Sequence, residues 1–278
     1  MFDFFYGDRD AVQENPEGFL LFVKHLLPRW ANGIPDSECL GIFRASNIEQ
    51  EVDEGGGRVL VESGVGASTL ALVLSAILSG RHSYSWDTNA SKGHFLRSVM
   101  SEAIAQPLGV NLYDFWTFIG MSASDPYVGF PIVAERGQIA SFAFLDSWHT
   151  QENLLAEVRS LAPVMREGSV IGIDDAHYRC RSVNYSYINL QRTKIGMSTL
   201  EEPPENIGET FGVTVRNELA THFDDVTPLV VVQGEELQED SHEAYFSDDR
   251  RVFASFGMED GSSFLERFQV WRLGKPSL

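Results

Sequence analysis

Short apolar runs alternate along the middle of the chain with segments whose apolar residues recur at helical spacing. These strand-like runs are residues 58–62, 82–86, 141–145 and 169–173, of which the second is read as a strand with two aromatic residues between polar ones. The helical pattern lies at residues 67–78, 92–105 and 151–165. Apolar strands that alternate with helices are typical of a sheet buried on both sides. The pattern therefore predicts an α/β fold with a mainly parallel central sheet and helices on both faces.

The chain ahead of this pattern is predicted to be helical. Apolar residues at helical spacing there are Phe19, Leu20, Phe22, Val23, Leu26 and Leu27. Pro28 ends the pattern because proline cannot continue a helix, and the glycines at 55–57 form a flexible junction. We therefore expect a helical N-terminal segment at residues 1–57, acting as a lid or packing extension, and one domain at residues 58–278.

The end of the chain follows a different pattern. Residues 207–223 have helical spacing, whereas residues 228–232 and 267–271 are apolar runs typical of strands. An acidic stretch at residues 234–249 separates these two runs. Because irregular sequence joins the two late strands, we expect an antiparallel C-terminal strand at one edge of the sheet.

Charge and hydropathy narrow the classes of partner. The formal net charge is -19 and the pI is near 4.7, so much of the surface repels phosphate backbones and we expect no nucleic-acid partner. The apolar run at residues 19–22 is far too short to cross a bilayer, and no positively charged leader precedes it. We therefore expect a cytoplasmic protein with no membrane partner. Cys39 and Cys180 have no metal-ligand spacing.

A glycine turn joins the first apolar run to the helical segment after it. Gly64 and Gly66 allow a tight turn and a close approach of a ligand. The spacing is not Gly-x-Gly-x-x-Gly, which disfavours a nicotinamide enzyme. Glu62, before the turn, repels a diphosphate and attracts an amino or sulfonium group. Asp87 ends the next apolar run, where an acid can accept both ribose hydroxyls. An ordinary βα turn beside a solvated strand end is the simpler alternative.

The segments VLVESGVGAST and SYSWDTN resemble the first and second motifs of the class I S-adenosylmethionine-dependent methyltransferases. The resemblance implies a Rossmann-like fold and S-adenosylmethionine as the cofactor. It also implies that Gly64 and Gly66 pass under the methionine part of the cofactor and that Asp87 binds its ribose. By the same resemblance, Glu62 helps to hold the turn and Ser68 contacts the carboxylate end of the cofactor.

Acidic residues also follow the third and fourth apolar runs. Asp146 comes after the third run, and Asp174 and Asp175 come after the fourth. One helix separates these runs, so adjacent parallel strands bring the three carboxylates to one edge of the sheet. Clustered carboxylates repel one another unless a cation joins them, and oxygen ligands suit Mg²⁺, Ca²⁺ or Mn²⁺. The simpler alternative is that each acid caps a loop.

The segments LDSWH and GIDDAH resemble the metal-dependent catechol O-methyltransferase-like group. The resemblance implies that Asp146, Asp174 and Asp175 hold Mg²⁺ or another divalent cation, and that Trp148 packs beside the adenine. His149 stands where that group has a catalytic lysine. A histidine with a pKa near ~6.5 accepts a hydroxyl proton near neutrality. Asp175 replaces the usual asparagine and makes the site more negative.

The favoured function is metal-assisted O-methylation of a small-molecule hydroxyl, with Asp146 and His149 as the catalytic residues. A metal-independent O- or N-methyltransferase, with His149 or His177 as base, stays open, as does a non-catalytic binding protein on the same fold. The expected partner is a small-molecule methyl acceptor, and self-association into a homo-oligomer stays open. The aromatic-rich residues 109–140 and 178–205 are predicted to form the wall that faces the acceptor.

Overall fold

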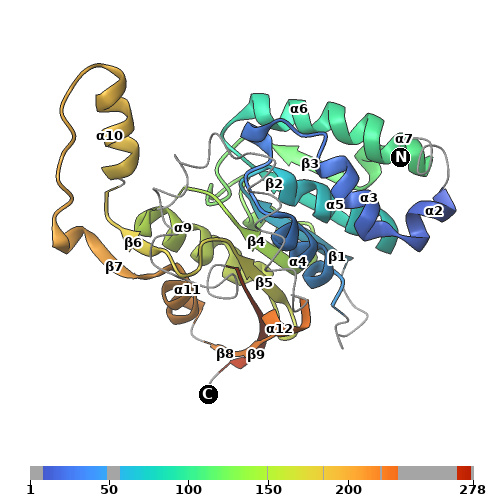
Figure 1. The fold of residues 1–278 in the computed structure, drawn as a ribbon. Coiled ribbons are helices and arrows are strands. Elements are labelled where there is room, and N and C mark those ends of the chain that lie inside the picture. Colours follow the sequence, from blue (N-terminus) through green and yellow to red (C-terminus); the bar gives the residue numbers. More distant parts are fainter. Residues whose placement is uncertain are drawn as a thin grey trace.

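The fold is known from a computed structural model. It describes residues 9–48, 57–148, 150–183, 185–219, 221–230 and 268–276. Figure 1 shows the course of the chain, with the N-terminal helices on one side of the central sheet and the hairpin that carries α10 projecting on the other.

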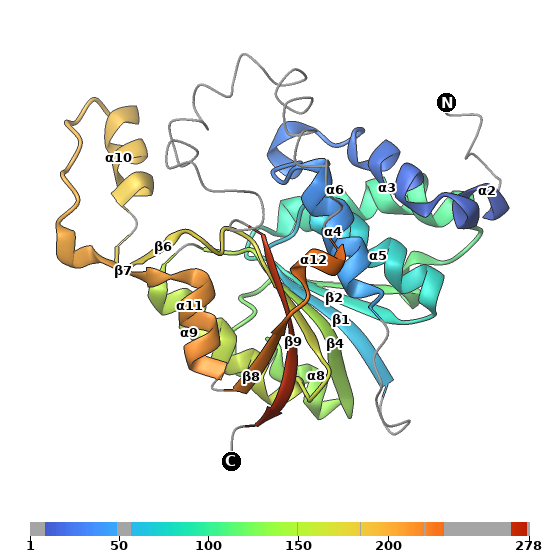
Figure 2. The same ribbon diagram turned by 60° about the horizontal axis from the view of Figure 1, so that its bottom comes forward.

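A seven-stranded sheet in the described part of the chain forms the centre of the molecule (Figure 2). Its strands are β1 (Gly57–Ser63), β2 (His82–Trp86), β3 (Trp116–Ile119), β4 (Gln138–Leu145), β5 (Val170–Ile173), β8 (Thr221–Asp225) and β9 (Gln269–Pro276). Their order is β3-β2-β1-β4-β5-β9-β8. The first five pair in parallel, and β9 runs antiparallel to both of its neighbours. The predicted fold class is confirmed. The antiparallel C-terminal strand is β9, and β8 lies beyond it at the edge of the sheet.

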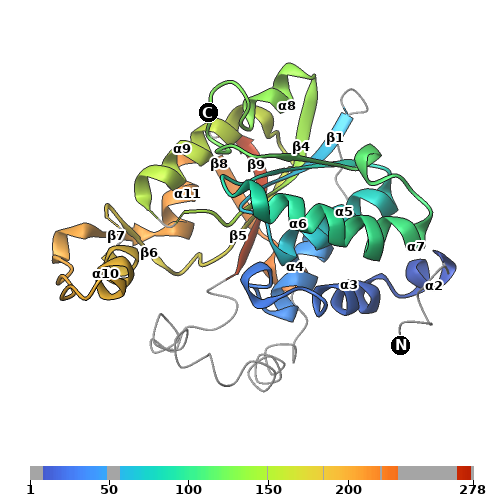
Figure 3. The same cartoon turned by 90° about the horizontal axis from the view of Figure 1, so that it is seen from above.

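Helices cover both faces of this sheet (Figure 3). The helices are α2 (Arg9–Glu14), α3 (Pro16–Lys24), α4 (Asp36–Ser46), α5 (Ala67–Ser79), α6 (Ala90–Met100), α7 (Gln106–Leu108), α8 (Pro131–Glu135), α9 (Gln151–Leu161), α10 (Tyr185–Lys194), α11 (Phe211–Leu219) and α12 (Thr227–Val230). The short helical turns are η1 (Arg29–Ala31), the π-helical η2 (Ser101–Ala105), η3 (Leu112–Asp114), η4 (Ala162–Val164) and η5 (Pro204–Asn206). No helix in the described ranges is long and apolar enough to cross a membrane.

The alternation of side chains along β1 explains why both faces are buried. Leu60 packs in one core with α3, α4, α5 and α6, whereas Val59 and Val61 pack in a second core with α8, α9 and α11. Successive strand residues point to opposite faces, so a fully apolar strand needs a helical layer on each side. The four apolar runs correspond to β1, β2, β4 and β5 and confirm this part of the prediction.

The described part of the N-terminal segment is helical and packs against the sheet domain. Asn15 accepts a hydrogen bond from the Gly18 amide (3.0 Å) at the start of α3, where Pro16 suits the first helical position. Phe19 of α3 joins the same core as α5, and Lys24 is fully buried with an ion pair to Asp36 (2.8 Å). The domain boundary at residue 57 stays a prediction.

Two expectations for the end of the chain were wrong in part. The helix expected at residues 207–223 is only α11, because β7 (Ile207–Thr210) precedes it and β8 follows it. Residues 228–230, expected as part of a strand, belong to α12. The Asp225 side chain accepts from the Thr227 amide (2.9 Å) and starts that turn. The rest of that expected strand, residues 231–232, lies outside the described residues.

A hairpin extends from the body after β5. It consists of β6 (Arg179–Arg181), α10 and β7, and β6 pairs with β7 in a separate two-stranded sheet. All views place α10 away from the main sheet (Figures 1 and 3). This hairpin therefore lies on the side of the molecule where the carboxyl ends of β4 and β5 are found.

Candidate functional site

The turn between β1 and α5 is tightly packed against the loop that follows β4. Gly64 has a φ of +83°, and a Cβ there would lie 1.7 Å from the carbonyl oxygen of Asp146. Glycine is therefore required at this position by both conformation and space. Gly66 immediately precedes α5 as its N-terminal capping residue, and its amide donates to the Thr69 hydroxyl (3.0 Å). The predicted turn and the predicted acidic edge thus meet in one place.

Glu62 is fully buried beneath the turn. Its carboxylate accepts hydrogen bonds from the hydroxyls of Ser68 (2.9 Å) and Ser85 (2.6 Å). Ser85 in turn accepts from the indole of Trp116 (2.8 Å). Burial raises the pKa of Glu62 to about 7, although the hydrogen bonds oppose that rise. The side chain ties β1 to α5 and β2, and it occupies the Ser68 hydroxyl.

Asp87 links the turn to the end of β2. One carboxylate oxygen accepts from the Val65 amide (3.1 Å), and the other accepts from the Asn89 amide (2.7 Å). The side chain is half-buried, and each carboxylate oxygen has capacity for a further hydrogen bond. An acid held at the rim of the glycine turn can accept ligand hydroxyls there.

The loop after β4 carries Asp146 and Trp148. The Asp146 amide donates to the Ser63 carbonyl (3.0 Å), which fixes the loop to the end of β1. Trp148 is exposed, and its ring lies 5.0 Å from that of Tyr187 on α10. The contact brings the projecting hairpin to the same loop. His149, the predicted base, lies outside the described residues.

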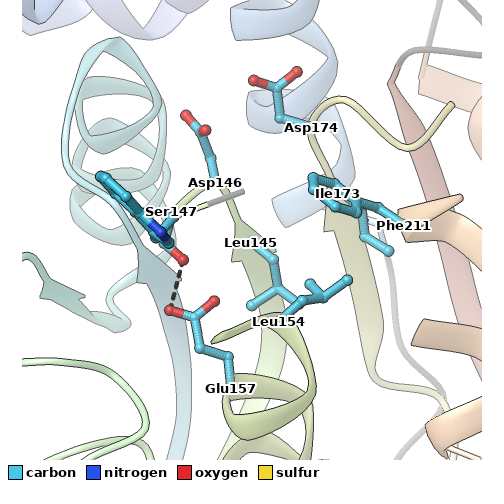
Figure 4. A pocket seen from close by; sticks show the side chains of 9 residues that line it. Leu145, Asp146, Ser147, Leu154, Glu157, Ile173, Asp174 and Phe211 are labelled. Carbon is cyan, nitrogen blue, oxygen red and sulfur yellow. Dashed lines mark hydrogen bonds between the residues drawn. The ribbon is translucent and has the colours of Figure 1, made fainter. Parts of the chain in front are cut away.

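Asp146 and Asp174 line one pocket at the carboxyl ends of β4 and β5, and Figure 4 shows both carboxylates at its rim. Its apolar lining residues include Leu145, Leu154, Ile173 and Phe211. Asp174 is only 7% exposed and accepts from the Asp175 amide (2.7 Å).

Asp175 does not line this pocket, and its backbone has a φ of 50°. Aspartate tolerates this left-handed conformation better than most residues. Among the described residues, no three side chains of metal-ligating type lie close enough together to hold a metal ion. The structure thus brings two of the three predicted ligands to one pocket, and the three-acid metal site stays a prediction.

Glu157 of α9 is a buried acid that the sequence analysis missed. It accepts hydrogen bonds from Ser147 (2.7 Å), drawn in Figure 4, and from Ser63 (3.2 Å). Burial raises the pKa of Glu157 to about 7, and these hydrogen bonds oppose the rise. Its signal was a glutamate among the inward residues of an amphipathic helix, next to Val158. Glu157 connects the end of β1 to the loop that carries Asp146.

Sequence comparison identifies the segment that contains these features. Residues 61–176 match the family model described as a methyltransferase domain, which is less than half of the chain. The match begins inside β1 and ends just beyond Asp175, so it spans the glycine turn, Asp87 and both acidic strand ends. This segment of the chain is thus similar to a methyltransferase domain. No curated protein matches the chain.

Several solved structures are similar to the methyltransferase domain and its surroundings. An O-methyltransferase from Bacillus cereus in complex with SAH is 18% identical and has a TM-score of 0.40, covering 63% of this chain and 76% of that one. Cofactor-bound Rv0187 from MTB is 18% identical with a TM-score of 0.43, covering 79% and 88%. An O-methyltransferase family protein from Burkholderia thailandensis is 11% identical with a TM-score of 0.42, covering 97% and 58%. At these scores the similarities alone assign no acceptor and no metal.

Proposed function

We propose that this methyltransferase domain transfers the methyl group of S-adenosylmethionine to a hydroxyl oxygen of a small molecule. The observation that carries the proposal is the convergence of three strand ends. Asp87 contacts the Val65 amide of the glycine turn, and Gly64 of the same turn packs on the Asp146 carbonyl. A cofactor on the turn and an acceptor beside Asp146 are therefore neighbours, as direct transfer requires.

The residues of the turn suit the chemistry of this cofactor. Gly64 and Gly66 keep the turn free of side chains, Asp87 offers acceptors for ribose hydroxyls, and Glu62 holds the turn from below. In the proposal Trp148 packs beside the adenine. The Ser68 hydroxyl already donates to Glu62, so Ser68 reaches the cofactor mainly through its backbone.

The acceptor lies, in this proposal, at the rim of the pocket that Asp146 and Asp174 line. The acceptor oxygen forms a bond to the methyl carbon as the carbon–sulfur bond breaks, and the hydroxyl proton passes to a base. His149 is the proposed base, with Asp146 beside it to orient the hydroxyl. The segments at 109–140 and 178–205 are the proposed acceptor wall, and the contact of Tyr187 with Trp148 supports this role for the second of them.

The proposal also includes a divalent metal ion that assists the transfer. Two of its three proposed carboxylate ligands, Asp146 and Asp174, line the same pocket. Mg²⁺ is commonly held by one or two carboxylates together with water and substrate oxygens, which Asp146 and Asp174 can supply. Asp175 is the proposed third ligand. A bound divalent ion lowers the pKa of an acceptor hydroxyl and fixes its position. If Asp174→Asn and exhaustive EDTA treatment both leave turnover on a confirmed acceptor unchanged, metal-independent transfer from the same edge replaces this part.

Calorimetric titration with S-adenosylhomocysteine tests the proposed cofactor site. The intact protein should bind it with micromolar affinity and should not bind NAD. Asp87→Ala should weaken binding about tenfold, because about 1.4 kcal/mol of ribose hydrogen bonding is lost. Asp224→Ala is the control, since Asp224 is exposed on β8. Binding of NAD in place of S-adenosylhomocysteine, or equal effects of the two substitutions, would contradict the proposed cofactor site.

A further inference from the structure

Lys92 lies beside the glycine turn, and its ammonium group has no partner among the residues that the structure describes. It lies in the first turn of α6, where the Asn89 side chain accepts from its amide (3.2 Å). Asn89 in turn donates its own amide to Asp87, so the backbone of Lys92 is fixed to the proposed ribose acid. Its side chain reaches back to the turn: a Cβ on Gly66 would lie 3.8 Å from the Lys92 ammonium nitrogen.

The Lys92 ammonium makes no hydrogen bond or ion pair within the part of the chain that the structure describes. This is unexpected in a chain with 40 acidic and 21 basic residues, where a carboxylate partner is usually near. The position also works against the helix, because a cation in the first turn is disfavoured by the helix dipole. A lysine that is unpaired among the described residues, and that stands in an unfavourable position for its helix, is available to bind a ligand.

The surroundings restrict what that partner can be. The ammonium stands beside Gly66, where α5 begins and presents its own unpaired amides. The carbonyl oxygen of Ala31 also borders this space, 3.5 Å from the Gly66 Cβ position. The Ser68 hydroxyl is turned to Glu62. Among the described residues, Lys92 is therefore a charged donor that is available at this turn for an anionic group.

We propose that Lys92 binds the carboxylate of the methionine part of the cofactor and so selects cofactors that carry it. The assignment rests on the proposed function, since it takes the ligand of the turn to be S-adenosylmethionine. Asp87 and Lys92 then divide the ligand between them: the acid holds the neutral ribose hydroxyls, and the lysine holds the charged amino-acid end.

Two ligands that differ only in the carboxylate can distinguish carboxylate binding by Lys92 from a purely structural role of this residue. Calorimetry is run with S-adenosylhomocysteine and with its decarboxylated analogue, which keeps the amino group. Lys92→Met should weaken binding of the first about tenfold and leave binding of the second unchanged, whereas Lys92→Arg should retain most of the affinity. Lys194→Met on α10 is the control, because Lys194 is exposed and also unpaired in the described structure; it should change neither affinity.

Thermal unfolding of the same variants excludes a folding defect. Lys92→Met should not lower the melting temperature, because the substitution removes a cation from the first turn of a helix. Equal weakening for both ligands, or no weakening for either, would overturn the role of Lys92 while leaving the proposed function intact. Failure of the wild-type protein to bind either ligand would instead contradict the proposed function.

Discussion

Two buried glutamates flank the end of β1 on opposite faces of the sheet. Glu62 lies on the α5 face and accepts from Ser68 and Ser85, whereas Glu157 lies on the α9 face and accepts from Ser63 and Ser147. Burial raises the pKa of both carboxyls to about 7, and the charge of Asp146 adds to the rise in each. On each face of the sheet, the candidate site is therefore held by a buried glutamate that accepts hydrogen bonds from two serine hydroxyls.

The two supports differ in what they hold. Glu62 secures the glycine turn to α5 through partners that are themselves fully buried. Glu157 secures the loop after β4. One of its partners, Ser63, is fully buried, but the other, Ser147, is only half-buried and also accepts from Asn153 (2.9 Å). The comparison indicates a rigid glycine turn beside a loop with more freedom, which suits the proposed roles of the turn in binding a constant cofactor and of the loop in binding a variable acceptor.

The largest expected effect is on the pH dependence of stability. A folded-state pKa near 7 means that the folded protein keeps protons that the unfolded chain releases near the usual glutamate pKa of 4.5. The free energy of unfolding should therefore fall as pH rises from about 4.5 to about 7, by several kcal/mol for the two groups together. Urea unfolding at both ends of this range measures it. A Glu62→Gln, Glu157→Gln double variant should lose most of this dependence; an unchanged dependence would contradict the shared mechanism.

Alanine substitutions should separate the two glutamates. Glu62→Ala should lower the free energy of unfolding by about 3 kcal/mol, because it leaves two fully buried hydroxyls without an acceptor. Glu157→Ala should cost about 1–2 kcal/mol, since it leaves only Ser63 fully buried without an acceptor, whereas Ser147 can turn to Asn153 or to water. Glu152→Ala, an exposed position on α9, should stay within about 0.5 kcal/mol. Chemical denaturation measures all three, and a larger loss for Glu157→Ala than for Glu62→Ala would reverse the comparison.

The central sheet could be predicted because its strands are buried on both faces. The runs at β1, β2, β4 and β5 consist mainly of apolar, aromatic or small residues, and their ends carry the turn or an acid. β8 has the sequence Thr-His-Phe-Asp-Asp, which shows no strand pattern, and it becomes a strand by pairing with β9. Its structure depends on a distant partner, so local periodicity could not reveal it.

In the candidate site too, residues at the ends of predicted elements could be predicted, whereas a residue that depends on distant partners could not. Glu62, Gly64 and Asp87 stand at ends of predicted elements, and parallel topology alone brings them together. Glu157 was missed because a helical glutamate is usually solvated. Only the arrival of Ser63 and Ser147 from other elements makes its burial favourable.

A crystal structure with S-adenosylhomocysteine tests the central claim most directly. The account predicts the adenosine across the end of β2 with its ribose hydroxyls on Asp87, the methionine part over Gly64 and Gly66, and its carboxylate on Lys92. The sulfur should face the pocket that Asp146 and Asp174 line. A ligand bound away from the glycine turn, or one whose sulfur points away from that pocket, would contradict the account.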